Sequence, residues 1–128
     1  METFSRGTLE PEYVTGFVDA AGSFTYSRSS KQLALYFALK VGATDRPLVE
    51  DVQAFFGGIG RIYAAGYFRV TRREELMMIV EHFDRHPLRS SKREVYELWR
   101  EMVLAKQEFR RPDRELLDRL ADEISRRR

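Results

Sequence analysis

The sequence predicts an α+β domain in which helices cover one face of an antiparallel sheet. Two observations carry this prediction. Several segments repeat apolar residues at helical spacing, and two pairs of short segments alternate apolar with polar residues. The expected order is helix, two strands, helix, two strands and further helices. Because 128 residues is about the length of one domain, we expect residues 1–128 to form a single domain.

The first helix is expected between Pro11 and Gly22. Proline suits the first turn of a helix because its missing N–H has no partner there, and glycine commonly follows a helix end. Between them, apolar side chains recur at helical spacing at Tyr13, Val14, Phe17 and Val18.

Two strands follow at residues 23–27 and 32–41, joined by a turn at Ser29-Ser30. Apolar residues of the second strand share one face, as half-buried strands require: Leu33, Leu35, Phe37, Leu39 and Val41. A second helix is expected to begin near Asp45 and Pro47 and to end at Gly57-Gly58.

The second strand pair is expected at residues 59–64 and 67–71, with Gly66 at the turn. Helices then fit residues 73–84, 90–106 and 113–125. Ser91 and Glu94 have the spacing of a capping box, and Pro112 suits the start of the last helix.

Composition excludes several classes of protein. The chain has no cysteine, which rules out disulfides and cysteine-based zinc sites. No apolar run reaches the length of a membrane span, and the N-terminus lacks the pattern of a signal peptide. We therefore expect no membrane partner and a cytoplasmic location, associated with the nucleoid if the source is bacterial.

The predicted sheet has one polar face that is rich in cations. Net charge is −3 over residues 1–21 and +4 over residues 22–72. The polar face contains hydroxyls, aromatic rings and basic groups and no acidic residue: Ser23, Thr25, Ser27, Tyr36, Lys40, Arg61, Tyr63, Tyr67, Arg69 and Thr71. Such groups bind phosphates and base edges, so DNA contact is the favoured interpretation and a merely solvated face is the alternative.

Small residues mark one face of the first helix. Gly16 and Ala20 are four residues apart and therefore lie on the same side of a helix. They allow another backbone to come close, either that of a second copy of the chain or that of an element in the same domain.

Here the sequence resembles a known family. Residues 14–22, VTGFVDAAG, resemble the nine-residue motif of LAGLIDADG homing endonucleases. The likeness continues through Phe55–Tyr63, His82-Phe83, Pro87-Leu88 with Lys92, and Tyr96–Trp99, and covers about residues 10–107.

The resemblance implies an αββαββα fold whose saddle-shaped sheet straddles double-stranded DNA, with extra helices at the C-terminus. One motif per chain implies a homodimer, and a pseudo-palindromic DNA target, because relatives with two motifs act as monomers. The dimer seam implied for the motif helix contains Thr15, Gly16, Asp19 and Ala20.

The resemblance also implies magnesium-dependent cleavage of DNA, through a carboxylate at the eighth motif position. That position is Ala21 here, and a methyl group cannot bind magnesium. Asp19 is two residues earlier, about 200° around a helix, so it does not replace the missing acid and is expected to have a structural role. Ala43 aligns with a polar residue that orients solvent in many relatives, while Lys92 matches a basic residue near their cleavage site. We therefore expect no metal or other cofactor.

The resulting hypothesis is a sequence-specific, homodimeric DNA-binding protein that does not cleave, with transcriptional regulation as its possible role. An inactivated endonuclease, natural or made in the laboratory, is an alternative, and Ala43 favours natural loss because one change would suffice to inactivate. An RNA maturase for introns and a module that binds protein are further alternatives.

Catalysis by His82 or His86 has little support. The arginines at 126–128 suit a helix C-terminus or, alternatively, a phosphate contact.

Overall fold

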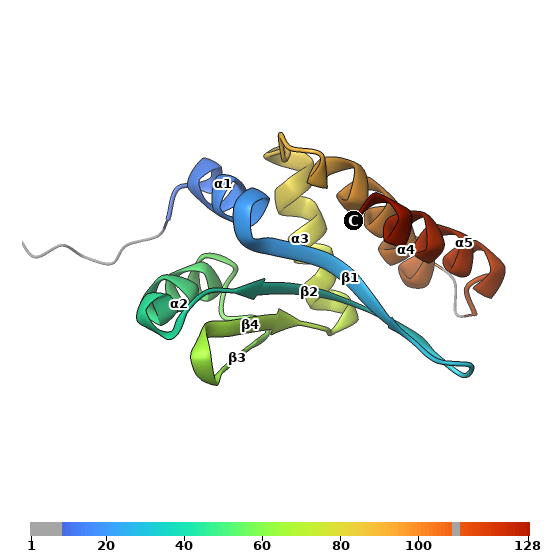
Figure 1. The fold of residues 1–128 in the computed structure, drawn as a ribbon, viewed down its shortest axis with the longest axis horizontal. Coiled ribbons are helices and arrows are strands. Elements are labelled where there is room, and N and C mark those ends of the chain that lie inside the picture. The colour runs from blue at the N-terminus through green and yellow to red at the C-terminus, as the bar shows by residue number, and fades with distance from the viewer. Residues whose placement is uncertain (1–8, 109–110) are drawn as a thin grey trace, which may run out of the picture.

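The computed structural model describes residues 9–108 and 111–128. Residues 1–8, which include Glu2 and Arg6 of the acidic N-terminal segment, and residues 109–110 lie outside this description. The elements follow the predicted order (Figure 1): α1 Pro11–Ala21, β1 Gly22–Arg28, β2 Leu33–Lys40, η1 Ala43–Asp45, α2 Arg46–Phe55, β3 Arg61–Tyr63, η2 Ala64–Gly66, β4 Tyr67–Val70, α3 Arg73–Arg85, α4 Lys92–Glu108 and α5 Arg114–Arg127. The predicted α+β class is confirmed.

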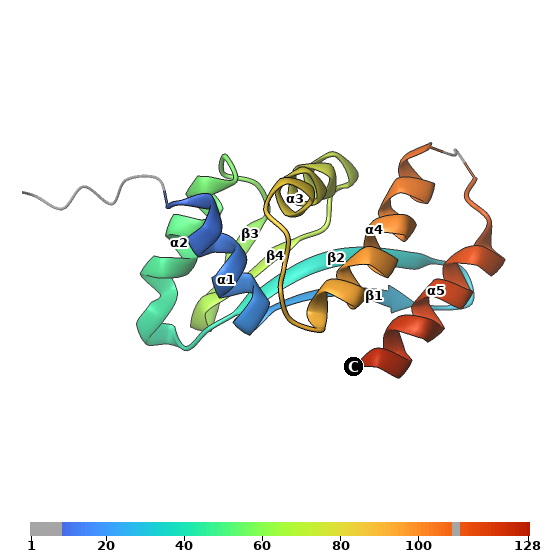
Figure 2. The same ribbon diagram turned by 90° about the horizontal axis from the view of Figure 1, so that it is seen from above.

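The four strands form one antiparallel sheet in the order β1-β2-β4-β3. Phe24 lies opposite Phe37, which lies opposite Val70. Directly opposed residues point to the same side of a sheet, so these three side chains share the face that the helices cover (Figures 1 and 2). All three are buried, which confirms the predicted alternation.

An aromatic cluster around Phe24 joins β1 to α3 and α4. The Phe24 ring centroid lies 5.3 Å from that of Phe83, 5.0 Å from Tyr96 and 5.2 Å from Trp99. The indole N–H of Trp99 donates to the backbone oxygen of Thr25 at 3.0 Å. This cluster therefore fixes the first strand to the two helices that cover it.

Helix α5 packs beside α4 along the edge strand β1 (Figure 2). The Tyr26 hydroxyl donates to the Ala121 backbone oxygen at 3.0 Å, and Arg28 pairs with Asp122 at 2.9 Å. Leu117, Leu120 and Ile124 are buried. Consequently the end of α5 lies near the start of the sheet.

Three local predictions were wrong in detail. The hydroxyl of Ser90, not Ser91, accepts the Lys92 amide at the start of α4, because Ser90 also bonds to Asp19. Helix α5 begins after Asp113, whose carboxylate accepts the amides of the first turn. The second hairpin has short strands because η2 occupies the turn, with Ala65 at a φ of 67°.

The junction of α1 and β1 requires glycine for space. A Cβ atom on Gly22 would lie 2.6 Å from Val18 Cγ1 and 3.1 Å from the Val18 backbone oxygen. The Gly22 backbone is extended, at a φ of −90°, so the constraint is close approach and not an unusual dihedral angle. Only a hydrogen side chain lets the helix pass directly into the strand.

We predict that Gly22→Ala lowers the free energy of unfolding by about 1–3 kcal/mol, because the added methyl must displace Val18 in a packed core. Gly42→Ala is the matched control, since a Cβ there meets no atom within 4 Å. Denaturant unfolding at one protein concentration measures both. Equal stability of the two variants would contradict the close approach at Gly22.

Candidate nucleic-acid interface

The face of the sheet away from the helices carries all ten predicted contact residues. Ser23 lies opposite Ala38, Ala38 opposite Arg69, and Arg69 opposite Arg61. The same parity places Lys40, Tyr67 and Tyr63 on this face, and Thr71 continues it beyond β4. The four strands contain no Asp or Glu, so basic groups set the charge of this surface, here called the open face.

Exposure on the open face is uneven. Six of its side chains are exposed, namely Ser23, Ser27, Lys40, Arg61, Tyr63 and Thr71, and three are half-buried, namely Tyr36, Tyr67 and Arg69. Thr25 is buried, and its hydroxyl accepts a hydrogen bond from Arg128. DNA contact by Thr25 stays a prediction, and it would require the Arg128 side chain to move from the Thr25 hydroxyl.

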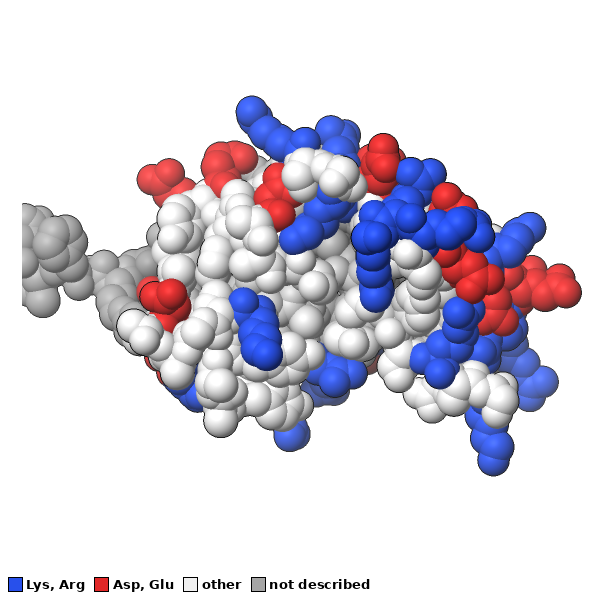
Figure 3. Space-filling view, in the orientation of Figure 1, with Lys and Arg blue, Asp and Glu red and all other residues white. Residues whose placement is uncertain are grey.

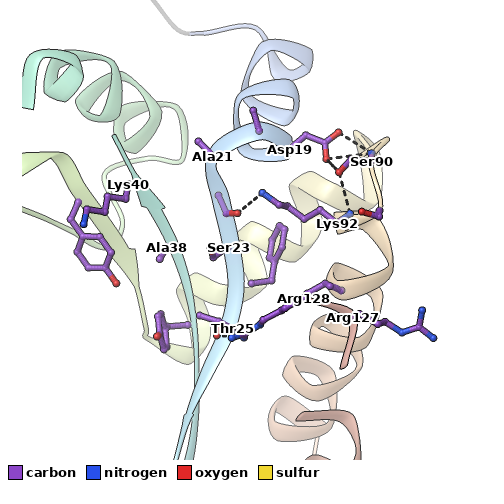
Figure 4. A pocket seen from close by; sticks show the side chains of 17 residues that line it. Asp19, Ala21, Ser23, Thr25, Ala38, Lys40, Ser90, Lys92, Arg127 and Arg128 are labelled. Carbon is purple, nitrogen blue, oxygen red and sulfur yellow. Dashed lines mark hydrogen bonds between the residues drawn. The ribbon is translucent and has the colours of Figure 1, made fainter. Parts of the chain in front are cut away.

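A pocket of about 730 Å³ lies where the tip of α1 meets the open face (Figure 4). Ala21 and Ser23 line it beside Lys92 from the start of α4. Lys40, Arg127 and Arg128 add three further cations. The sequence left a helix-end role and a phosphate contact open for the two arginines, and the packing of α5 against β1 brings them to this pocket.

Lys92 binds the end of the motif helix. Its ammonium donates to the backbone oxygens of Val18 at 3.1 Å and Gly22 at 2.5 Å. These carbonyls are at the negative end of the helix dipole, which favours a cation. Burial lowers the pKa of Lys92, and the nearby charge of Asp19 opposes this shift.

Asp19 connects α1 to the segment before α4. Its carboxylate accepts the Arg89 amide at 2.9 Å, the Ser90 amide at 3.1 Å and the Ser90 hydroxyl at 2.5 Å. Burial would raise its pKa, but these hydrogen bonds and the charge of Lys92 outweigh burial and lower the pKa. Asp19 therefore has the structural role within the chain that its position on the helix suggested, and its place at a dimer seam stays a prediction.

Thr15 is buried and bonds to the end of α3. Its hydroxyl donates to the His86 backbone oxygen at 2.8 Å and accepts from His82 Nε2 at 2.9 Å. Its place at a dimer seam stays a prediction. Gly16 and Ala20 remain exposed, and a Cβ on Gly16 would meet nothing within 4 Å.

Ala43 lies in η1, exposed and after β2, and is not part of the lining of the pocket at Ala21. The role of Ala43 at a shared site stays a prediction.

Among the helices within residues 9–108 and 111–128, none combines the length and apolarity that a membrane span needs.

The residues at the α1 tip do not fit a magnesium ion. Magnesium binds hard oxygen ligands, and Ala21 offers a methyl group. The Asp19 carboxylate is engaged by three donors, and the Val18 and Gly22 carbonyls are bound by Lys92. Nowhere in the described parts of the chain do three His, Asp or Glu side chains gather as a metal site would need. No cleavage step follows from this geometry.

The chain belongs to the LAGLIDADG endonuclease family, whose sequence model matches residues 14–103. An uncharacterised 50.9 kDa protein in ND4 intron 1 of Podospora anserina is 33% identical over 115 residues. That match covers 80% of this chain but only 25% of the relative, so this chain spans about a quarter of the relative's length.

Solved structures share the fold. The meganuclease I-AabMI bound to uncleaved DNA superposes with a TM-score of 0.79 at 26% identity, over 88% of this chain and 42% of that one. I-SmaMI bound to cleaved DNA gives 0.79 at 28% identity, over 89% and 42%. I-TnaI, a homing endonuclease, gives 0.76 at 23% identity and matches 94% of this chain and 97% of its own. The predicted αββαββα fold is confirmed.

His82 is the titratable group most strongly shifted at the base of α1. Burial, aided by the positive charge of His86, lowers its pKa to about 4, while Glu12 opposes the shift. As the pH falls, His82 is therefore protonated first in the unfolded chain, near its ordinary pKa of 6.5. The stabilisation by neutral His82 is complete above about pH 6.5 and is lost as the pH falls toward 4.

We predict that His82→Gln flattens the decrease in stability between pH 7 and pH 4. A glutamine amide can still donate to Thr15 but takes up no proton, so the variant should lose about 3 kcal/mol less than the parent over this range. Denaturant unfolding at several pH values measures the difference in stability between variant and parent. The titration of carboxylates is common to both proteins and cancels in this difference. Parallel curves would mean that His82 is not held neutral.

Proposed function

We propose that this chain is a homodimer that binds double-stranded DNA sequence-specifically, on a pseudo-palindromic site, and does not cleave it. One observation carries the proposal: a cationic sheet face free of acidic residues adjoins a motif helix that ends in the methyl group of Ala21. The first feature suits DNA, and the second removes the carboxylate that the family uses to hold metal. Regulation of transcription is a role that such a protein can serve.

Support for DNA binding comes from the open face and from the relatives. Two meganucleases of similar fold are described in complexes with DNA. On the open face, Arg61 and Arg69 lie opposite each other in the ladder. Like charges in that position repel, and a polyanion would relieve the repulsion.

Support for a homodimer comes from the exposed side of α1. Gly16 and Ala20 are exposed, and Tyr13 nearby is 50% exposed. Figure 3 shows acidic groups along the upper edge over α1, a mostly uncharged surface below them, and mixed charges over α4 and α5.

We predict that Gly16→Leu yields a monomer. The open space around Gly16 means that the leucine does not strain the chain itself, and its helix propensity should stabilise the fold by up to about 1 kcal/mol. Sedimentation velocity would report the loss of dimer. Ala54→Leu, on the exposed side of α2, is the control that should stay dimeric; a dimeric Gly16→Leu would contradict the α1 seam.

Selection from a random duplex pool tests the function directly. We expect the selected sites to have two-fold symmetry. If the dimer neutralises about six phosphates, log affinity should fall with log salt with a slope of about −5. With magnesium or manganese the selected duplex should stay intact, and the absence of any selected sequence, or cleavage of the site, would contradict the proposal.

Two further experiments distinguish the remaining alternatives. Ala21→Asp restores the carboxylate. Cleavage by this variant would show that loss of one group inactivated the site, whereas no cleavage would show that changes such as Ala43 have also dismantled it.

The relative in ND4 intron 1 favours an RNA maturase as the second candidate. Preference for intron RNA over the selected duplex in competition would support that candidate.

A further inference from the structure

Arg69 lies at the centre of the open face. It belongs to β4, which has a strand on each side, whereas Arg61 opposite it belongs to the edge strand β3. On its other side Arg69 faces Ala38, whose short side chain leaves space above the sheet. The guanidinium uses that space to reach the diagonal neighbour Tyr36.

Stacking holds the guanidinium in one place. Arg69 Cζ lies 3.9 Å from the centroid of the Tyr36 ring, well within the range in which the ring face attracts a cation. Arg69 is half-buried, unlike the exposed Arg61. Its side-chain entropy is therefore partly lost before any ligand binds, which lowers the cost of binding.

Arg69 has a side-chain donor that finds no acceptor among residues 9–108 and 111–128. Its Nε is buried and makes no hydrogen bond with any described residue. Other arginines have carboxylate partners, as Arg28 has in Asp122 and Arg100 has in Asp84. A buried donor without a partner is costly. Because the side chain as a whole is only half-buried, an acceptor from outside can still reach the exposed part of its guanidinium.

We infer that Arg69 reads a guanine in each half-site, by donating to its O6 and N7 atoms in the major groove. This inference rests on the proposed DNA binding. The planar fork of arginine matches these two acceptors, and bases face the centre of a bound sheet whereas phosphates flank it. Tyr36 is the positioning residue, and Arg61 at the edge contacts a phosphate.

Arg69→Gln and Arg61→Gln form a matched pair for the test, because they remove the same charge from opposed positions. Both full-length variants and the parent are put through selection from a random duplex pool, then measured against the parent's selected site and against sites with one base pair changed. Thermal melting followed by circular dichroism checks that each variant is folded.

The parent should select a G·C pair at two symmetric positions, and changing that pair should weaken its binding about 5- to 150-fold. Arg69→Gln should lose this preference, or prefer adenine there, with all other positions unchanged. Arg61→Gln should keep the guanine and bind every sequence more weakly. Tyr36→Phe should keep the preference and Tyr36→Leu should relax it.

Two results overturn the inference while leaving DNA binding intact. The first is that Arg69→Gln selects the same bases as the parent. The second is that Arg69→Gln binds all sequences more weakly by the same factor, as the loss of a phosphate contact would cause. If the parent itself selects no duplex sequence, the proposed function fails and the inference fails with it.

Discussion

The structure depends on the direct passage from α1 into β1. Gly22 comes so close to Val18 that no side chain fits between them, and the Lys92 ammonium joins the carbonyls of these same two residues. With Asp19 bonded to Ser90, this fixes the motif helix between the sheet and the start of α4. One side of α1 is thereby buried, and the side with Gly16 and Ala20 is left free for another chain.

The same junction sets the chemistry beside the open face. A helix end presents unpaired carbonyls and partial negative charge, and here an ammonium neutralises them. Because Ala21 adds no carboxylate, the surroundings of the pocket remain cationic, with Lys40, Arg127 and Arg128 around it. The helix and sheet arrangement of the family is kept, while Ala21 offers no acid that could hold a metal.

Periodicity predicted most of the fold and the composition of the open face, because alternation along a strand decides which residues share a side. It could not predict the partners of individual side chains. Thr15 and Asp19 are on the motif helix, yet both bond within the chain, to residues about seventy positions away. Thr25 has the parity of a contact residue but is covered by Arg128. The stacking of Arg69 on Tyr36 also depends on a diagonal contact between β4 and β2, which only the register reveals.

A crystal structure of the protein with its selected duplex, grown in magnesium, tests the central claim most directly. We predict two chains per duplex, with the α1 helices adjoining, the open faces in the grooves, and unbroken DNA with no metal between the Ala21 positions. A metal ion bound there, cut strands, or DNA on another surface of the protein would contradict the account.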